Sequence, residues 1–512
     1  MVPSSKQAAI YHEWETTDNN ILIQAVAGSG KTTTLLHLLS LCKYKTLYIA
    51  FNKSIQIDTE KKISERGLNQ GRAMTIHSLG LMAIKYVHKK VEIDDKKGWK
   101  ILNEVEKRRP LYFDMKSGLF STYEEIMRLR FTLMDMNEVS RVYMENDPEN
   151  IIGTMVTMDK NIYLNDGINL GDLWEVVMEV REEFYNKSPL VIDFTDMIYL
   201  PARGDYYIPV DPYYLLIDEA QDLNLAQHKL IDNLVNQGDI KKWIAVGDRN
   251  QSIYGFSGAF ASSFDLFKTK PKVVEMPLDI CYRCPTLVIE AANEVYPVLI
   301  PNKIEPGVVN TFTNDFSNLA RTPGAMVICR NKGPLIDIYF ELIGKEIPCK
   351  LYGDDIMGSI LRFLGSYKKM SISRALVDIQ KELHELEVDQ KTPLKQMMFA
   401  VMQENYKNFV TLYSKLGFSK GDSVSSLMEK FKDLFKGGTK DIILCTIHKS
   451  KGLEADVVYI LNEYLIPSKF AKSPEQIKQE QNLKYVARTR AKEELYFLNT
   501  AKTEDFVLIE DV

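Results

Sequence analysis

The residues best suited to chemistry lie in one short stretch near the start of the chain, Ala25 to Thr32, which reads AVAGSGKT. An apolar run precedes this stretch and a helix-forming run follows it, which predicts a turn between a strand and a helix. Backbone N–H groups in such a turn and the positive end of the helix can hold phosphate groups, and Gly28 and Gly30 allow the close approach. Lys31 can reach the β- and γ-phosphates, and the Thr32 hydroxyl can reach Mg²⁺. The stretch therefore predicts a binding site for a nucleoside triphosphate.

Two acidic residues can supply the second part of this chemistry. Tyr214 to Ile217 is an apolar run that predicts a buried strand, and Asp218 and Glu219 follow it directly. In a chain with a phosphate-binding loop, Asp218 can hold Mg²⁺ through water, and Glu219 can orient and activate the attacking water. A bare Asp-Glu pair is often a surface turn, but its place after an apolar strand favours the functional interpretation.

A further polar stretch follows the apolar run Trp243 to Val246. Gln251 can lie beside the γ-phosphate and sense its hydrolysis, and Tyr254 and Phe256 can offer ring faces on which bases stack. Aromatic residues at this spacing are also common in cores, so stacking is one of two interpretations. Near the N-terminus the amide of Gln7 can pair with adenine, and a solvated position on a helix is the alternative.

The composition is that of a globular protein, with 45% hydrophobic and 26% charged residues among 512. This length exceeds a single core and predicts roughly three or four domains or subdomains. No run is long enough to span a membrane and no signal peptide is visible, so we expect a soluble intracellular protein, cytoplasmic or, if the source is eukaryotic, nuclear. Because the net charge is −5, a nucleic-acid partner would have to be held in a local groove.

The six cysteines do not suggest a disulfide framework in a chain of this length. Cys281 and Cys284 form a single CxxC pair with no second pair at metal spacing, which argues against a zinc site.

Apolar runs and helical periodicity divide the chain into two halves. Further strands are predicted at residues 46–50, 325–329, 348–352, 441–445 and 456–461. Residues 90 to about 190 and about 368 to 437 are charged, with helical periodicity and no strong strand, which predicts two mostly helical insertions. Polar loops follow several strands, and the carboxyl edge of a parallel sheet is where ligands bind. No internal repeat is visible.

Together these stretches resemble the UvrD, Rep and PcrA group of superfamily 1A helicases, in the family's order from Gln7 to Arg490. The resemblance implies an α/β fold with two RecA-like parallel-sheet motor domains, each with a mostly helical insertion. The first motor domain, which binds ATP, would comprise residues 1–89 and 190–283, with a helical insertion at 90–189. The second would comprise residues 284–367 and 438–512, with a reduced helical insertion at 368–437.

The resemblance also implies roles for individual residues. The phosphates would be held by Ala27, Gly28, Ser29, Gly30, Lys31, Thr32 and Thr33, with Thr32 and Asp218 on Mg²⁺ and with Lys31, Glu219 and Gln251 in catalysis. Gln7 and Tyr282 would contact the adenine, Glu454 the ribose, and Arg283 and Arg490 the γ-phosphate as arginine fingers. Single-stranded DNA would lie along Asn52, Thr75, His77, Tyr254, Phe256, Thr446 and His448.

The implied function is an ATP-dependent 3′–5′ DNA helicase that requires Mg²⁺, translocates on single-stranded DNA and unwinds duplex at single-strand/double-strand junctions. The stretch GDRNQSIYGFSGA is the main basis for the polarity. One alternative is a DNA-stimulated translocase that strips proteins or regulates recombination without processive unwinding, and another is a nucleotide-dependent switch that binds a protein. We expect a monomer in isolation, with replication or recombination proteins as candidate partners and no membrane partner.

Overall fold

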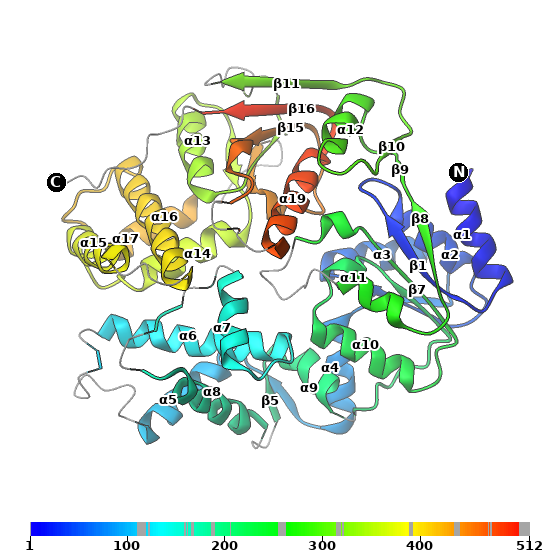
Figure 1. Ribbon diagram of the computed structural model, residues 1–512, viewed down its shortest axis with the longest axis horizontal. Helices are drawn as coiled ribbons and strands as arrows, with labels where there is room; N and C mark the ends of the chain where they lie inside the picture. The colour runs from blue at the N-terminus through cyan, green and yellow to red at the C-terminus, as the bar shows by residue number, and fades with distance from the viewer. Residues whose placement is uncertain are drawn as a thin grey trace. The chain divides into compact units, whose positions relative to one another are not determined.

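The computed structural model describes residues 2–500 except 110–118, 121–122, 158–159, 161, 165–167, 186–189, 205, 254–262, 314–318, 320–321, 389–392, 435–440, 469–470 and 472–473. The chain folds into two compact units, unit 1 from Met1 to Asp279 and unit 2 from Ile280 to Val512 (Figure 1). Each unit is an α/β body built on a six-stranded parallel sheet. The division falls close to the boundary at residue 283 that the resemblance implies.

The sheet of unit 1 has the strand order β3-β2-β6-β7-β1-β8, and all neighbouring strands are parallel. The strands are β1 (Asn20–Ala25), β2 (Thr46–Ala50), β3 (Gly71–Thr75), β6 (Tyr214–Ile217), β7 (Lys242–Gly247) and β8 (Val273–Leu278). Every residue of β2 and β7 is buried, as expected for parallel strands covered by helices on both faces. Since β6 and β7 lie between β1 and β2, the loops after these four strands open at the same edge of the sheet.

Helices cover both faces of this sheet. They are α1 (Ser5–Thr16), α2 (Lys31–Leu41), α3 (Lys53–Glu65), α4 (Ile76–Val87), α9 (Asp196–Arg203), α10 (Leu225–Asn236) and the single turn α11 (Ser263–Leu266). Because side chains alternate along a strand, Ile21 and Ile23 share one core with α1 and α2, whereas Leu22 belongs to the core under α4, α9 and α10. The packing of α4 on α9 is close, since a Cβ at Gly80 would lie 1.8 Å from a backbone oxygen of α9.

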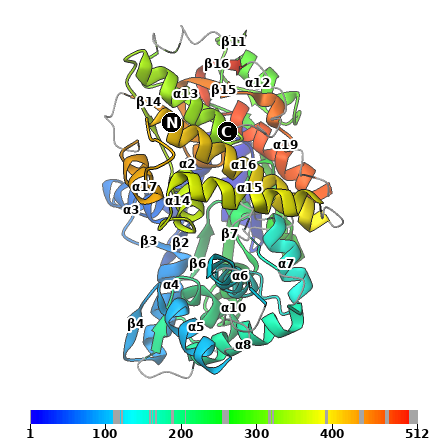
Figure 2. The ribbon, with the colours of Figure 1, turned by 90° about the vertical axis from the view of Figure 1, so that its left-hand side faces the viewer.

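The first predicted insertion contains four helices in its described part, α5 (Lys97–Arg108), α6 (Tyr123–Val142), α7 (Pro148–Thr157) and α8 (Leu170–Tyr185). Figures 1 and 2 show α5, α6 and α8 packed against one another. The sequence pattern missed a short strand here, because β4 (Val91–Ile93) pairs in parallel with β5 (Leu190–Ile192). Beside this pair, the buried Asp196 carboxylate contacts Lys97 and lies 2.7 Å from Arg141, which anchors the helices to α9.

The sheet of unit 2 has the strand order β11-β16-β15-β12-β14-β13, again with parallel neighbours only. Its strands are β11 (Val308–Thr313), β12 (Met326–Cys329), β13 (Cys349–Leu351), β14 (Ile442–Thr446), β15 (Ala455–Leu461) and β16 (Ala491–Asn499), and a small pair joins β9 (Ile280–Cys281) to β10 (Ile300–Pro301). The helices are α12 (Thr286–Asn293), α13 (Lys332–Gly344), α14 (Asp354–Gly365), α15 (Ile372–Val388), α16 (Pro393–Lys415), α17 (Val424–Asp433), the short α18 (Ile447–Ser450) and α19 (Pro474–Arg488).

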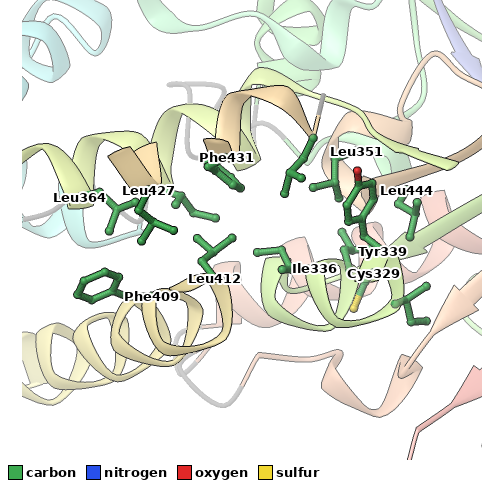
Figure 3. Packing of buried hydrophobic residues seen from close by; sticks show 14 of the residues in the cluster. Cys329, Ile336, Tyr339, Leu351, Leu364, Phe409, Leu412, Leu427, Phe431 and Leu444 are labelled. Carbon is green, nitrogen blue, oxygen red and sulfur yellow. The ribbon is translucent and has the colours of Figure 1, made fainter. Parts of the chain in front are cut away.

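One hydrophobic core of unit 2 joins the sheet to the helices of the second predicted insertion. Figure 3 shows strand residues such as Cys329 and Leu444 in the same cluster as Phe409 of α16 and Phe431 of α17. Figure 2 shows α14, α15, α16 and α17 grouped together. Because these helices complete the core over the sheet, they act as part of the body of unit 2.

The structure confirms the predicted fold class and the strands expected at 46–50, 214–217, 243–246, 325–329, 348–352, 441–445 and 456–461, to within a residue or two. The pattern did not identify β8, β11 and β16. These strands lie at or next to a sheet edge, where polar positions interrupt the apolar run. Within the part of the chain that the structure describes, no helix combines the length and apolar character needed for a membrane crossing.

Candidate nucleotide-binding site

The phosphate-binding loop lies between β1 and α2, as its sequence predicts. Gly28 and Gly30 have φ values of 66° and 79°, in the left-handed region that side chains disfavour, so these two glycines set the shape of the turn. Lys31 is the first residue of α2, and Gly30 precedes it as the N-cap without any side-chain cap. The Ser29 hydroxyl is buried and has no hydrogen-bond partner within the described residues. An uncapped helix N-terminus beside an unsatisfied buried hydroxyl fits an anionic ligand.

Two carboxylates follow β6 and face this loop. Glu219 Oε1 lies 3.1 Å from Lys31 Nζ, which joins the end of β6 to the start of α2. Asp218 is buried and accepts a hydrogen bond of 2.7 Å from the hydroxyl of Tyr48 on β2. Glu219 has a φ of 51°, a strained conformation for a residue with a side chain and one that is frequent at functional sites.

Charge is concentrated around the Lys31 ammonium. Burial would lower the pKa of Lys31, but the nearby Glu219, Asp248 and Asp218 outweigh burial and raise it. Burial raises the pKa of the Asp218 carboxyl to about 6, and Glu219 adds to the increase. Burial also raises the pKa of Asp248. Three acidic side chains around one ammonium leave an excess of negative charge, which suits a divalent cation.

The oxygen ligands present here also suit Mg²⁺. Thr32 provides a hydroxyl in the first turn of α2 and Asp218 provides a carboxylate, the hard oxygen donors that Mg²⁺ prefers. Among the described residues, no group of three or more His, Cys, Asp and Glu side chains could hold a metal ion by itself. A magnesium ion at this position would therefore need phosphate oxygens and water to complete its coordination.

The loop after β7 lies beside the acidic pair. The buried Asp248 accepts a hydrogen bond of 2.8 Å from Gln251 Nε2 and caps its own turn through the N–H of Asn250. The amide of Gln221 connects this loop to β6, because it donates to Glu219 and accepts from the N–H of Asp248. The structure thus brings together Lys31, Glu219 and the loop that contains Gln251.

Gln7 is buried against the phosphate-binding loop, which rules out the solvated position considered from the sequence. Its Nε2 donates to Thr34 Oγ1 at 3.1 Å, and its Oε1 accepts the N–H of Ser4 in a capping box at the start of α1. A Cβ at Gly30 would lie 3.8 Å from this amide. Gln7 therefore lies close enough to the loop to contact a nucleotide held there.

Four of the predicted nucleotide contacts gather on unit 2. Arg283 Nε lies 2.7 Å from Glu454 Oε2, and Arg283 Nη1 donates to the Thr489 carbonyl at 3.1 Å. Tyr282 is half-exposed. Arg490, the next residue after Thr489, is buried. Its guanidinium donates hydrogen bonds to the carbonyls of Val486 and Leu453 at 2.9 and 3.2 Å. These hydrogen bonds hold the Arg490 guanidinium in place within unit 2.

Three predicted DNA contacts are helix N-caps that follow strands. Asn52 accepts the N–H of Ile55 at the start of α3, Thr75 caps α4 after β3, and Thr446 caps α18 after β14. These caps place helix N-termini at the carboxyl edges of the two sheets, where backbone N–H groups and the helix dipole favour phosphates.

The two predicted DNA-contacting histidines lie in the first turns of the helices capped by Thr75 and Thr446. Burial lowers the pKa of His77, and burial together with nearby cationic side chains lowers that of His448, so both are neutral at pH 7. Beside His77, with ring centroids 6.4 Å apart, lies Phe194, whose side chain is 56% exposed. The remaining predicted contacts, Tyr254 and Phe256, lie outside the described residues.

Sequence reasoning missed three residues that the structure places at these sites: Tyr48, Gln221 and Phe194. Two of them lacked a signal of their own, because Tyr48 looks like part of an apolar strand and Gln221 like part of a polar turn. Phe194 stands in a polar sequence, IDFTD, and an isolated aromatic residue there was the one available signal.

Comparisons with known proteins agree with this geometry. The UvrD/REP helicase N-terminal domain matches residues 4–272, and the UvrD-like helicase C-terminal domain matches residues 205–502. F-box DNA helicase protein 1 of Schizosaccharomyces pombe is 25% identical over 526 residues, covering 95% of this chain and 56% of that protein. A probable DNA helicase of Mycoplasma pneumoniae is 26% identical, with 66% and 50% covered, and the ATP-dependent DNA helicase Rep of Buchnera aphidicola is 26% identical, with 57% and 44% covered.

The chain spans about half the length of the curated relatives that it matches. Among solved structures, the helicase nonstructural protein 10 of an arterivirus aligns with a TM-score of 0.34 and 12% identity, over 94% of this chain and 59% of its own. Each of the two family models matches more than half of the chain, and together they run from the first helix to the last strand. The chain belongs to the UvrD/Rep helicase family.

Proposed function

We propose that this chain is an ATP-dependent 3′–5′ DNA helicase that translocates on single-stranded DNA and unwinds duplex. The observation that carries the proposal is the ion pair between Lys31 of the phosphate-binding loop and Glu219 at the end of β6, at 3.1 Å. This pair supports the proposal because an ammonium that can bind phosphate and a carboxylate that can activate water lie side by side at the same edge of one parallel sheet. Such an arrangement is suited to transferring a phosphoryl group to water.

In this proposal the residues of the loop bind the triphosphate. The N–H groups at the start of α2 and the Lys31 ammonium hold phosphate oxygens, and Gln7 reads the adenine. Thr32 and Asp218 would hold Mg²⁺, which when bound neutralises charge that develops on the phosphates. Glu219 orients and deprotonates the attacking water, and Gln251 lies close enough to respond to the γ-phosphate.

Unit 2 supplies the remaining nucleotide contacts. Tyr282 offers a half-exposed ring for the adenine and Glu454 a carboxylate for the ribose. Arg283 and Arg490 serve as arginine fingers, a role that contributes about 10³- to 10⁵-fold to the rate in well-studied phosphoryl-transfer enzymes.

The DNA strand is proposed to follow the capped helix N-termini. Asn52 and Thr75 in unit 1 and Thr446 in unit 2 place N–H groups where strand phosphates can accept them. His77 and His448 are neutral at pH 7 and can donate a hydrogen bond without a positive charge. Tyr254, Phe256 and the exposed ring of Phe194 would stack on bases, which needs no sequence preference.

The catalytic part is tested with ATPase assays in the presence of single-stranded DNA. Lys31→Ala and Glu219→Gln should each abolish the stimulated turnover and leave strand binding intact, because neither residue is assigned to the strand. Lys45→Ala is a matched control, since Lys45 pairs with Asp211 on the exposed surface at 2.6 Å. Turnover retained in both site variants would refute the assignment.

The polarity and the unwinding are tested with fork substrates. A duplex with a 3′ single-stranded tail should be separated in an ATP-dependent manner, and one with a 5′ tail should not. ATP hydrolysis stimulated by single strands without separation of either substrate would favour the alternative, a translocase that strips proteins or regulates recombination. ATP hydrolysis without any DNA stimulation would point to a nucleotide-dependent switch for a protein partner.

A further inference from the structure

We propose that Gln221 is a positioning residue that holds the Glu219 carboxylate and ties it to the loop from Asp248 to Gln251. The inference rests on the proposed function, which assigns water activation to Glu219. It adds a residue to which neither the sequence nor the resemblance gives a role.

The contacts of Gln221 use both ends of its amide. Gln221 lies in a 3₁₀ turn, Ala220–Asp222, directly after Glu219, and its side chain is 1% exposed. Nε2 donates to Glu219 Oε2 at 2.6 Å and to Asp222 Oδ2 at 3.0 Å. Oε1 accepts the backbone N–H of Asp248 at 3.0 Å. A single side chain therefore links the carboxylate at the end of β6 to the first residue after β7.

The end of β7 is shaped to admit this amide. A Cβ at Gly247, the last residue of β7, would lie 2.4 Å from Gln221 Oε1, closer than any side chain tolerates. Gly247 does not have a left-handed φ, so a Cβ there would disturb the position of the Gln221 amide and not the backbone angle. A second link runs in the same direction, because Ser252 Oγ donates to the Gln221 carbonyl at 3.2 Å.

A neutral amide is the side chain that these partners require. A carboxylate needs donors and a backbone N–H needs an acceptor, and glutamine supplies both from one planar group. Glutamate at this position would lose the donors and place a second negative charge against Glu219. Methionine would keep a similar size and lose all three hydrogen bonds of the amide.

The link places Glu219 between two competing partners. On one side its carboxylate pairs with Lys31 at 3.1 Å, and on the other it accepts from Gln221. The loop at Asp248 continues to Gln251 and then, along the chain, to the predicted base-stacking residues. A displacement of that loop would therefore be passed through Gln221 to the carboxylate that activates water.

The test compares Gln221→Met and Gln221→Glu with the wild-type full-length chain. In both variants kcat for ATP should fall by about 10-fold to 100-fold, the effect expected for losing a hydrogen bond to a charged group. The KM for ATP and the affinity for a fluorescent ATP analogue should change by less than about three-fold, since Gln221 touches no phosphate-binding group. The ratio of kcat with and without single-stranded DNA should fall as well.

Gln237→Met is the matched control. Its amide also bridges backbone groups, accepting from the Ile208 N–H at 2.7 Å and donating to the Ile208 carbonyl at 3.1 Å, away from the site. This variant tests for a general loss of packing, and thermal unfolding of all variants shows whether they fold.

The possible results separate the two parts of the inference. A kcat within about two-fold of wild type in folded Gln221→Met, or an equal loss in Gln237→Met, would overturn the positioning of Glu219. An unchanged DNA stimulation ratio would overturn the link to the loop. If wild-type turnover did not respond to DNA, the proposed function would fail, and the unstimulated kcat of Gln221→Met would still decide the role at Glu219.

Discussion

Replacing Asp218 with asparagine should stabilise unit 1 above about pH 6 and leave its stability unchanged near pH 4. Burial raises the pKa of the Asp218 carboxyl from 3.8 to about 6. The folded chain therefore keeps a proton on Asp218 that the unfolded chain releases between pH 3.8 and about 6, so stability falls as the pH rises through this window. This increase in the pKa corresponds to ~3 kcal/mol, and a neutral amide removes that cost.

The assay is urea unfolding followed by tryptophan fluorescence. All four tryptophans, Trp14, Trp99, Trp174 and Trp243, lie in unit 1, so the signal reports that unit separately from unit 2. Nucleotide and divalent cations are left out, because any ligand of the folded state would add binding free energy. At about pH 8 the variant should gain ~3 kcal/mol in the free energy of unfolding, and at about pH 4 it should match the wild type.

Asp211→Asn is the control for the Asp218 experiment. Asp211 pairs with Lys45 on the surface, and this pairing lowers the pKa of its carboxyl, so the variant should show no gain as the pH rises. A gain of equal size at both pH values for Asp218→Asn, or none at the higher pH, would refute the reasoning. Under the proposed function, the carboxylate at Asp218 would be kept as a magnesium ligand, which would be a trade of stability for activity.

Three further changes test packing and the strand path. Gly80→Ala should destabilise unit 1 by at least about 1–3 kcal/mol, because its Cβ would lie 1.8 Å from a backbone oxygen of α9. Gly153→Ala in α7, where the new Cβ would have open space around it, should stabilise the unit by up to about 1 kcal/mol. Urea unfolding measures both variants, and equal effects would contradict the close packing at Gly80. Asp196→Ala should cost about 3–5 kcal/mol in the same assay, because two buried cations lose their shared partner, and a cost below about 1 kcal/mol would contradict this. Phe194→Ala should weaken single-strand binding by about 1–3 kcal/mol in fluorescence anisotropy, whereas Tyr86→Ala, which removes an equally exposed ring, should not.

The central strands of both sheets could be predicted from the sequence, because a strand buried on both faces is a continuous run of apolar residues. TLYIA of β2 and YLLI of β6 contain almost no polar residue, and both were found within a residue of their bounds. The edge strands β8 and β11 are only partly buried and carry polar residues between the apolar ones, so the apolar pattern in their sequence is weaker. The sequence pattern did not predict the β4–β5 pair, because its two strands have three residues each and are about 100 residues apart in sequence.

The nucleotide site was predictable where each residue carries its own chemistry. Lys31 in GKT and the acidic pair after β6 are informative by type and spacing, and the structure brings Lys31 and Glu219 together at 3.1 Å. The partners that hold them were not predictable. Tyr48 reaches Asp218 because β2 and β6 are neighbours in the sheet, and Gln221 reaches the Asp248 N–H because β6 and β7 are neighbours. No local sequence pattern records this strand order.

The two units share one local motif that is not visible as a repeat in the sequence. Thr75 ends β3 and Thr446 ends β14, and each is followed by Ile and His. In both places the threonine caps a helix and the histidine lies in its first turn. Three identical residues are too few to register as a repeat over about 370 positions, but the strand and cap around them make the match structural. Both copies offer backbone N–H groups and a neutral imidazole, and Arg330, Lys332 and Lys451 add positive charge near His448. We therefore propose that each unit binds a phosphate of the strand at this motif. Under the proposed function, such local sites would let a chain with a net charge of −5 bind an anionic strand.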